Sequence, residues 1–117
     1  MKSGSVYRAE RCVVPIVWYA ADPWTRLRGL LGRKPLEPAA GEGLLIEPCS
    51  SVHTFWMRYP LDLIFLDSNS RVVDICENVT PWSVRIGRGA RKTLELAAGS
   101  VAAFGPRIGE ELIWRGH

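Results

Sequence analysis

The sequence predicts a mainly β, or β-rich α+β, fold: a small closed barrel or jelly-roll-like sandwich with one short N-terminal helix and a single helical turn before the last strand. Two observations support this class. The stretch Pro48 to Asp67 is the most apolar in the chain, and within it Leu61–Leu66 is apolar on both alternating sets of positions except at Asp62, which is typical of a strand buried on both sides. About seven short runs suited to strands are also separated by turn residues, which indicates a compact barrel or sandwich.

The N-terminal part of the chain predicts one strand followed by the helix. The apolar run Arg11–Tyr19 predicts the first strand. Asp22 and Pro23 form a helix start signal, because aspartate caps exposed backbone amides and proline fits the first helical position. The helix is expected over residues 24–32 and ends at Gly32.

The second half of the chain predicts a hairpin and further short strands. Leu61–Leu66 and Val72–Glu77 are separated by polar turn residues, so we expect them to pair antiparallel, both as central strands of the sheet. Ser100 is expected to cap a helical turn that ends at Phe104, before Gly105 and Pro106. The other predicted strands are Leu44–Ile46, Val84–Ile86, Arg91–Leu96 and Glu111–Arg115.

Composition and charge indicate a globular chain of 117 residues. With 47% hydrophobic residues and a net charge of +3, the chain is unlike disordered proteins, and its dispersed basic residues do not suggest nucleic-acid binding. We expect residues 1–10 to be a flexible N-terminus and residues 11–117 to form a single β-rich domain. The apolar run Cys12–Ala21 is too short for a membrane-spanning helix, which needs about 20 residues. No signal peptide is evident, so we expect a cytoplasmic monomer without a membrane span, with association to the cell envelope as the alternative.

The three cysteines do not form a metal-binding pattern. Cys12, Cys49 and Cys76 lie too far apart in sequence for a zinc motif, and we expect buried free thiols, with a Cys49–Cys76 bridge left open. Cys49, His53 and Met57 recur every four residues and belong to the ligand types of copper, but four extended residues span about 13 Å. We therefore expect no metal and no cofactor.

Cys49 and His53 are weak candidates for a nucleophile and a general base. They would need to come within hydrogen-bond reach, which a tight coil after Pro48 allows, and Asp62 or Glu47 could orient the imidazole. A single histidine between apolar residues is more often a hydrogen-bonded structural residue. The thiol-dependent reaction is therefore the alternative hypothesis.

Asp62 is the one charged residue in the apolar strand Leu61–Leu66. A buried carboxylate needs partners, and Arg58 is the nearest cation in sequence, so we expect an ion pair or backbone hydrogen bonds that fix the bend before this strand. The functional alternative is that Asp62 lines a binding cleft together with His53.

A group of basic residues near two glycines is a candidate anion-binding site. Guanidinium groups and glycine-flanked backbone can bind phosphate or carboxylate, although a solvated loop carries such charge as readily. These residues are Arg85, Arg88, Arg91 and Lys92.

Several blocks of the sequence together resemble the family of proteins built on domain of unknown function 192, also called uncharacterised protein family 127. The resemblance covers nearly the whole chain and implies a small, mostly β barrel or sandwich, with no assigned reaction. Many family members carry an export signal or a lipoprotein leader, and neither is evident here. The matching blocks are Arg28-Gly29-Leu30-Leu31-Gly32-Arg33, Gly43-Leu44-Leu45-Ile46, His53-Thr54-Phe55-Trp56-Met57-Arg58, Pro60-Leu61-Asp62-Leu63-Ile64-Phe65-Leu66-Asp67, Leu94-Glu95-Leu96 with Ala98-Gly99, and Gly105 through Glu110.

The sequence therefore favours a non-enzymatic module that binds a small ligand or a protein partner, with an envelope or secretion assembly as one possible setting. Its binding residues are expected around a cleft near His53, Trp56, Arg58 and Asp62. The rival hypothesis is a hydrolase-like enzyme that uses Cys49 and His53.

Overall fold

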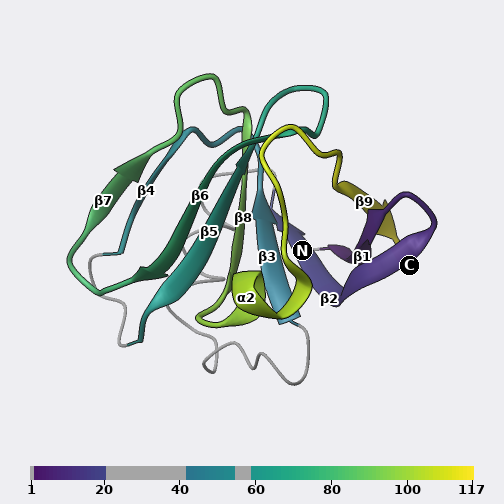
Figure 1. The fold of residues 1–117 in the computed structure, drawn as a ribbon, viewed down its shortest axis with the longest axis horizontal. Coiled ribbons are helices and arrows are strands. Elements are labelled where there is room, and N and C mark those ends of the chain that lie inside the picture. Colours follow the sequence, from purple (N-terminus) through teal and green to yellow (C-terminus); the bar gives the residue numbers. More distant parts are fainter. Residues whose placement is uncertain (1, 21–41, 55–58) are drawn as a thin grey trace.

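The computed structural model describes residues 2–20, 42–54 and 59–117 of the chain. Within these residues the chain forms nine β-strands and one short helix, α2 (Ser100–Phe104), as Figure 1 shows. The strands are β1 (Lys2–Arg8), β2 (Arg11–Ala20), β3 (Glu42–Ile46), β4 (Ser51–His53), β5 (Leu61–Leu66), β6 (Val72–Val79), β7 (Val84–Ile86), β8 (Lys92–Ala97) and β9 (Ile113–Gly116).

Seven of these strands form one mixed sheet, in the order β6-β5-β8-β3-β2-β1-β9, and β4 and β7 form a separate two-stranded sheet. The neighbouring strands of the large sheet are antiparallel except β2 and β3, which run parallel. A parallel pair requires a crossover connection, and here the connection falls in residues 21–41, outside the described part. The mainly β class is therefore confirmed.

The closed barrel that the sequence predicted is wrong for the described residues. β6 and β9 are the two ends of an open sheet. The ends are joined only by an isolated bridge between Arg71 and Glu111 and by backbone bonds beside it, such as Leu112 N to Ser70 O at 2.9 Å. Gly109 has a φ of 88°, which is not an extended backbone conformation. The chain before β9 therefore does not continue as a strand paired with β6, and the sheet stays open. The second sheet has only two strands and does not match the first as in a jelly roll.

The predicted hairpin is confirmed, since β5 pairs antiparallel with β6, with Ile64 opposite Ile75. β5 is central because β8 pairs on its other side, whereas β6 is an edge strand, so the prediction that both strands are central was wrong for β6. The hairpin pattern in the sequence does not show whether a second strand flanks β6. Its residues between Val72 and Val79 are only partly buried or exposed, as an edge strand allows.

The N-terminal segment and the cap of α2 also differ from the sequence prediction. Lys2–Arg8, expected within a flexible terminus, forms β1 and bonds to both β2 and β9, because its residues Gly4 to Val6 are buried. The predicted helix over residues 24–32 lies outside the described residues. α2 occurs where the helical turn was predicted, but Ser100 does not cap it: its hydroxyl donates to the Ala97 carbonyl at 2.6 Å.

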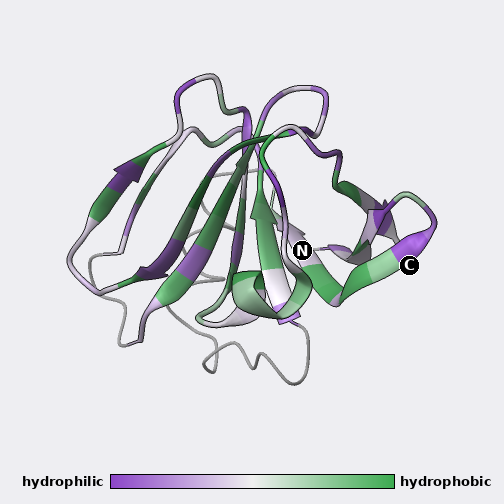
Figure 2. Cartoon of the chain, in the orientation of Figure 1, coloured by the Kyte–Doolittle hydropathy of each residue, from purple (hydrophilic) through white to green (hydrophobic). Residues whose placement is uncertain are grey.

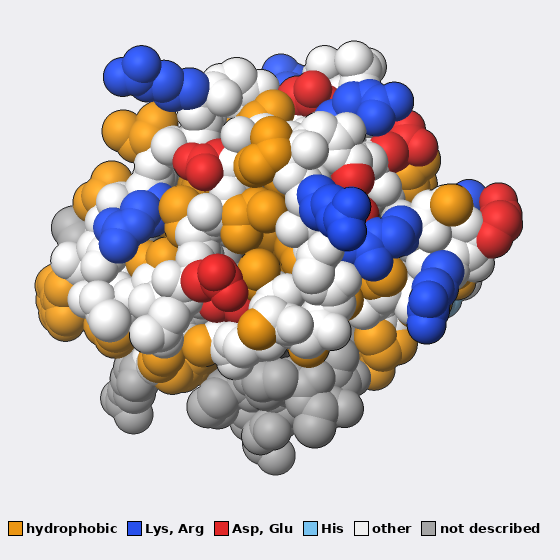
Figure 3. All heavy atoms as spheres, in the orientation of Figure 1, with side chains coloured by type: hydrophobic (Ala, Val, Ile, Leu, Met, Phe, Trp, Pro, Cys, Tyr) orange, Lys and Arg blue, Asp and Glu red, His pale blue; other side chains and the backbone are white. Residues whose placement is uncertain are grey.

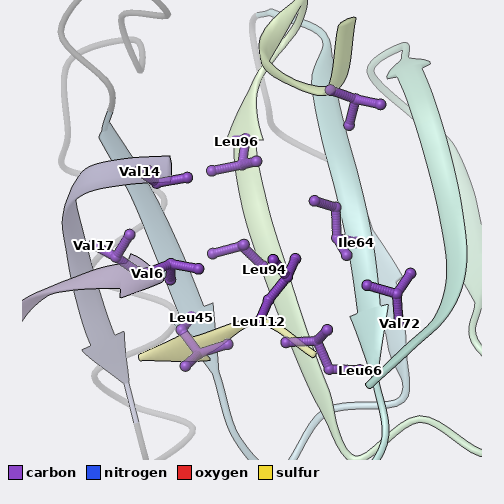
Figure 4. Close-up of a cluster of buried hydrophobic side chains, with 11 residues drawn as sticks. Val6, Val14, Val17, Leu45, Ile64, Leu66, Val72, Leu94, Leu96 and Leu112 are labelled. Carbon is purple, nitrogen blue, oxygen red and sulfur yellow. The ribbon is translucent and has the colours of Figure 1, made fainter. Parts of the chain in front are cut away.

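Each face of the large sheet carries its own apolar layer. On one face, side chains from β1, β2, β3, β8 and β5 converge with Leu112 in a single cluster, shown in Figure 4. On the other face, Leu61, Leu63 and Phe65 of β5 pack with Val52 of the small sheet. β5 is therefore buried at all six positions, and Figure 2 colours most of its length as hydrophobic.

Gly87, just after β7, brings the two sheets into contact. A Cβ atom at Gly87 would meet the Phe65 side chain at 2.4 Å, so only glycine allows the backbone to lie on this ring. No helix among the described residues is long and apolar enough to cross a membrane.

Candidate functional site

A pocket of about 310 Å³ lies over the sheet face that carries the first core cluster. Its floor comes from adjacent strands β2, β3, β8 and β5, and its wall comes from β9 and the residue before it. We call it the Lys92 pocket. It is lined by Val6, Tyr19, Leu45, Glu47, Leu66, Ser70, Lys92, Leu112, Ile113 and Trp114.

Glu47 and Lys92 both line this pocket, near the end of the β3–β8 ladder. β3 and β8 are antiparallel and their last pair is Ile46 opposite Thr93, so Glu47, the next residue after β3, is expected to lie near Lys92, the first residue of β8. Side chains at facing positions start about 4.5–5.5 Å apart at their Cβ atoms, close enough for an ion pair. No ion pair joins them, although both residues belong to the described chain, because each side chain turns to a different partner.

Glu47 turns toward β2. Its Oε1 accepts a hydrogen bond from the Tyr19 hydroxyl at 2.9 Å, and its Oε2 lies 4.0 Å from Nε of the largely exposed Arg91. The hydrogen bond to Glu47, burial and the Glu47 charge together raise the pKa of Tyr19 above its ordinary value of 10.0. Tyr19 therefore stays a neutral donor, which fixes one carboxylate oxygen and leaves the other with acceptor capacity.

Lys92 turns the opposite way, toward the turn between β5 and β6. Its Nζ donates to Ser70 Oγ at 2.9 Å. Ser70 is held in place because Asp67 closes this turn, accepting bonds from the amides of Asn69 and Arg71 at 2.8 and 3.0 Å. An ammonium group has three N–H donors, so the bond to Ser70 orients Lys92 and leaves donors for another group.

Two aromatic side chains of the pocket, Tyr19 from the floor and Trp114 from the wall, are fixed by their own contacts. The rings of Tyr19 and Trp114 lie 5.1 Å apart between centroids, tilted by 32°, which is a favourable aromatic arrangement. Trp114 Nε1 also donates to the Val17 carbonyl at 2.9 Å. The other apolar lining residues are Val6, Leu45, Leu66, Leu112 and Ile113. The arrangement can therefore hold an apolar body with polar groups at its end.

Asp62, a predicted site residue, lies inside the sheet and not in this pocket. It is 1% exposed, and both oxygens accept backbone amides: Oδ1 from Asn78 at 2.8 Å, and Oδ2 from Gly99 at 3.1 Å and Val101 at 2.9 Å. The last two bonds cap the start of α2. Backbone hydrogen bonds thus hold Asp62, as one alternative of the prediction had it, but they come from β6 and the start of α2 and not from the bend before β5. Arg58, the predicted ion-pair partner, lies outside the described residues.

The other predicted cleft and catalytic residues are only partly described. Trp56 lies in the same undescribed segment as Arg58, and His53 is exposed at the end of β4. Cys49 is partly buried, its thiol donates to the Ser51 carbonyl at 3.1 Å, and it lines a second hollow of about 220 Å³ with Ser50 and Arg91. The catalytic roles of Cys49 and His53 stay predictions.

All three cysteines are free, and Cys12 is exposed, contrary to the expectation of buried thiols throughout. Burial, with the nearby Asp74 charge, raises the pKa of the Cys76 thiol. No group of three or more His, Cys, Asp or Glu within the described ranges could hold a metal ion.

The four residues of the predicted anion site lie on different elements. Arg85 is on the exposed strand β7, and Arg88 is in the following turn. Arg91 immediately precedes β8, and Lys92 is its first residue. Lys92 belongs to the Lys92 pocket and Arg91 to the Cys49 hollow. Anion binding by the group stays a prediction.

The model of the DUF192 family (Uncharacterized ACR) matches residues 7–114. The chain belongs to the DUF192 family. A UPF0127 protein of Pyrococcus horikoshii, PH1112, is 38% identical over 66 residues, 56% of this chain and 56% of the relative. A UPF0127 protein of Thermococcus sibiricus is 35% identical over 66 residues, 56% of this chain and 42% of the relative. The matches thus span about half the length of these curated relatives.

Two solved structures share the fold of this DUF192 chain. The "putative transcription regulator" of Sinorhizobium meliloti superposes with a TM-score of 0.78 at 27% identity, over 97% of this chain and 92% of the other. A protein of unknown function from Novosphingobium aromaticivorans superposes with a TM-score of 0.79 at 24% identity, over 96% of this chain and 84% of the other, and shows the fold alone.

Sequence analysis of this DUF192 chain missed the Lys92 pocket. It treated Lys92 as part of a basic loop and Glu47 as a possible partner of His53, and it gave Tyr19 and Trp114 no role. The register of β3 with β8 decides the proximity of Glu47 and Lys92, and the pairing of β9 with β1 brings Trp114 to the wall. Neither pairing leaves a local signal in the sequence.

Proposed function

We propose that this DUF192 protein is a non-enzymatic binding module that holds a small ligand in the Lys92 pocket. The observation that carries the proposal is the pocket itself: about 310 Å³, with apolar and aromatic lining residues and a few polar groups from different elements. Ligand sites in proteins have this make-up and start at about 300 Å³. The size favours a small molecule over a long peptide.

The polar groups of the pocket are oriented before any ligand binds. Tyr19 holds Glu47, and Ser70 holds Lys92, so neither charged side chain has to be ordered on binding. Preorganisation of this kind lowers the entropy lost on association. The pocket is therefore suited to recognising polar groups at defined positions.

A thiol-dependent hydrolase using Cys49 and His53 is the second candidate, favoured by the hollow that Cys49 lines beside Arg91. An activated thiolate reacts rapidly with a thiol-specific reagent at neutral pH. We expect slow labelling of Cys49, because its thiol donates to the Ser51 carbonyl. Labelling far faster than that of a free model thiol would favour the enzyme.

Gene regulation is a further possibility raised by the description of the Sinorhizobium meliloti structure. A DNA-binding surface needs a concentrated basic stripe. On the face shown in Figure 3, lysine and arginine side chains lie in several separate places, with acidic groups between them. We propose that the protein binds no nucleic acid and acts as a cytoplasmic monomer, with the envelope or a secretion assembly as the alternative setting for a protein partner.

The test is ligand screening by NMR with a pocket-filling variant. We expect hits from a library of small polar molecules to shift the amides of Lys92, Ser70 and Ile113. Ile113→Trp should fill the pocket and abolish these shifts, whereas Ile108→Trp, at an exposed position outside the pocket, should keep them. Shifts centred on His53 that survive in Ile113→Trp would overturn the proposed site and favour the predicted cleft instead.

A further inference from the structure

The Lys92 pocket holds an acid and a base that face each other without pairing. Glu47 follows β3 and Lys92 begins β8. The two residues come next after the last pair of the β3–β8 ladder, Ile46 opposite Thr93. Glu47 is instead held by the Tyr19 hydroxyl, with the largely exposed Arg91 4.0 Å from its other oxygen, and Lys92 is held by the Ser70 hydroxyl. Opposite charges at facing positions usually stabilise a sheet by pairing. Their separation over an apolar floor is suited to a ligand that bridges them.

We infer that the ligand is a small zwitterion of the α-amino-acid type with an apolar side chain, an inference that rests on the proposed function. Its carboxylate accepts from the Lys92 ammonium, and its ammonium donates to the Glu47 carboxylate. Its side chain lies on the apolar part of the pocket, which Leu45, Leu66 and Leu112 form. A small pocket can accept such a ligand because its ammonium and carboxylate groups are attached to the same carbon atom and lie close together.

Ligands with a single charge fit this pocket less well. A simple anion would satisfy Lys92 but leave the Glu47 carboxylate facing a like charge, and a simple cation would do the same at Lys92. Each mismatch also removes water from a charged group without replacing its hydrogen bonds. A zwitterion avoids both costs.

A further hollow, lined by Arg8, Arg71, Arg107 and Glu110 among others, does not offer the same chemistry. Arg8 there is already bonded to both Glu110 oxygens, at 2.6 and 3.2 Å, and to the carbonyls of Phe104 and Gly105. Arg71 donates to the Gly109 carbonyl at 3.0 Å. Arg8 is therefore already paired with an acidic side chain, whereas no ion pair involves Lys92 among the described residues.

The experiment uses leucine and two derivatives that each lack one charge. N-acetyl-leucine has no ammonium, and leucine amide has no carboxylate. In calorimetric titrations of the full chain we expect each derivative to bind about tenfold more weakly than leucine, the ratio for losing one charged hydrogen bond. Equal binding of leucine and either derivative would overturn the inference.

Variants show where each charge is recognised. In Glu47→Gln, leucine should bind about tenfold more weakly, while N-acetyl-leucine should bind as it does to the wild type, because the interaction it lacks has already been removed. Lys92→Met should behave likewise toward leucine amide. Arg107→Gln, which removes a cation outside the pocket, should change none of these affinities. The ligand comparison on the wild-type protein decides the question even if a variant fails to fold.

The outcomes separate this inference from the proposed function. If the uncharged analogue 4-methylpentanamide binds as tightly as leucine and shifts the amides of Lys92 and Ile113, the pocket is a binding site but the zwitterion is wrong. If neither leucine nor any library compound shifts these amides, the proposed function is wrong as well.

Discussion

Two groups of charged side chains belong to the same sheet and differ in how completely the protein uses them. Asp62 on β5 is 1% exposed, and three backbone amides donate to its two oxygens. Glu47, just after β3, and Lys92, the first residue of β8, each have one side-chain hydrogen bond to a neutral hydroxyl and line a pocket. Glu47 also lies 4.0 Å from the largely exposed Arg91. The Asp62 group is closed within the protein, whereas the Lys92 pocket is open to another molecule.

The difference shows that a charged residue beside apolar residues can be structural or can bind a ligand. Its position in the sequence does not tell which of the two roles it has. A buried carboxylate is tolerated only when its oxygens are satisfied, and Asp62 meets this condition by linking the β6 end to the start of α2. A charge with remaining capacity must instead stay partly hydrated or meet a ligand. Counting the hydrogen bonds of each charged group therefore separates structural from binding residues.

The largest expected effect is on the closed group. Asp62→Ala should lower the free energy of unfolding by about 3–5 kcal/mol, because it leaves the amides of Gly99 and Val101 without their acceptor in a buried place. This is a large part of the about 5–15 kcal/mol that stabilises a domain. Urea unfolding followed by circular dichroism measures it.

Asp62→Asn is the matched control for shape. The amide side chain keeps one acceptor oxygen and the volume of Asp62, so its loss of stability should be smaller than that of Asp62→Ala. A wild-type unfolding midpoint in either variant would contradict the closed group and return Asp62 to the list of binding candidates.

An intermediate effect is expected at a third charged group, the pair of Arg8 and Glu110. Burial raises the pKa of Glu110, but hydrogen bonds from Arg8 and the Arg107 amide, with the charges of both arginines, outweigh it and hold the pKa below its ordinary value of 4.5. A depressed pKa in the folded state means that the stability is present above the unfolded pKa and is lost as the pH falls through the folded pKa.

Glu110→Gln should therefore cost about 1–2 kcal/mol at neutral pH, reduced by the partial exposure of Arg8. The difference from the wild type should shrink as the pH falls below 4.5. Urea unfolding of both proteins across this range tests the sign. A difference that is unchanged at low pH would show that Glu110 contributes by shape and not by charge.

Much of the fold could be predicted from sequence because its signals are local. The continuous apolar run of Leu61–Leu66 identified the most buried strand, and the polar turn after it identified the hairpin with β6. The helical turn at Ser100–Phe104 was placed correctly from Ser100 and from the stop at Gly105 and Pro106, although Ser100 does not cap it. Family membership followed from the same blocks of sequence, since the DUF192 model matches residues 7–114.

What could not be predicted depends on contacts between distant segments. An open or closed sheet is decided by how β6 and β9 meet near Arg71 and Glu111, and turn residues alone do not show this. The cap of α2 comes from Asp62, 37 residues before Gly99, and not from the adjacent Ser100. The Lys92 pocket was missed for the same reason, because its walls come from both ends of the chain.

The smallest expected effect is on the open group, and it completes the comparison. Glu47→Gln keeps an acceptor for the Tyr19 hydroxyl, and Lys92→Met keeps the apolar stem of lysine, so each should change the free energy of unfolding by less than about 0.5 kcal/mol. In Glu47→Gln the pKa of Tyr19 should fall back toward 10.0, because the carboxylate acceptor and its charge are gone. Urea unfolding and an NMR titration of the tyrosine ring carbon measure the two effects. A loss of stability as large as that of Asp62→Ala would mean that Glu47 and Lys92 are structural residues as well. This result would contradict the proposal that the Lys92 pocket is a binding site.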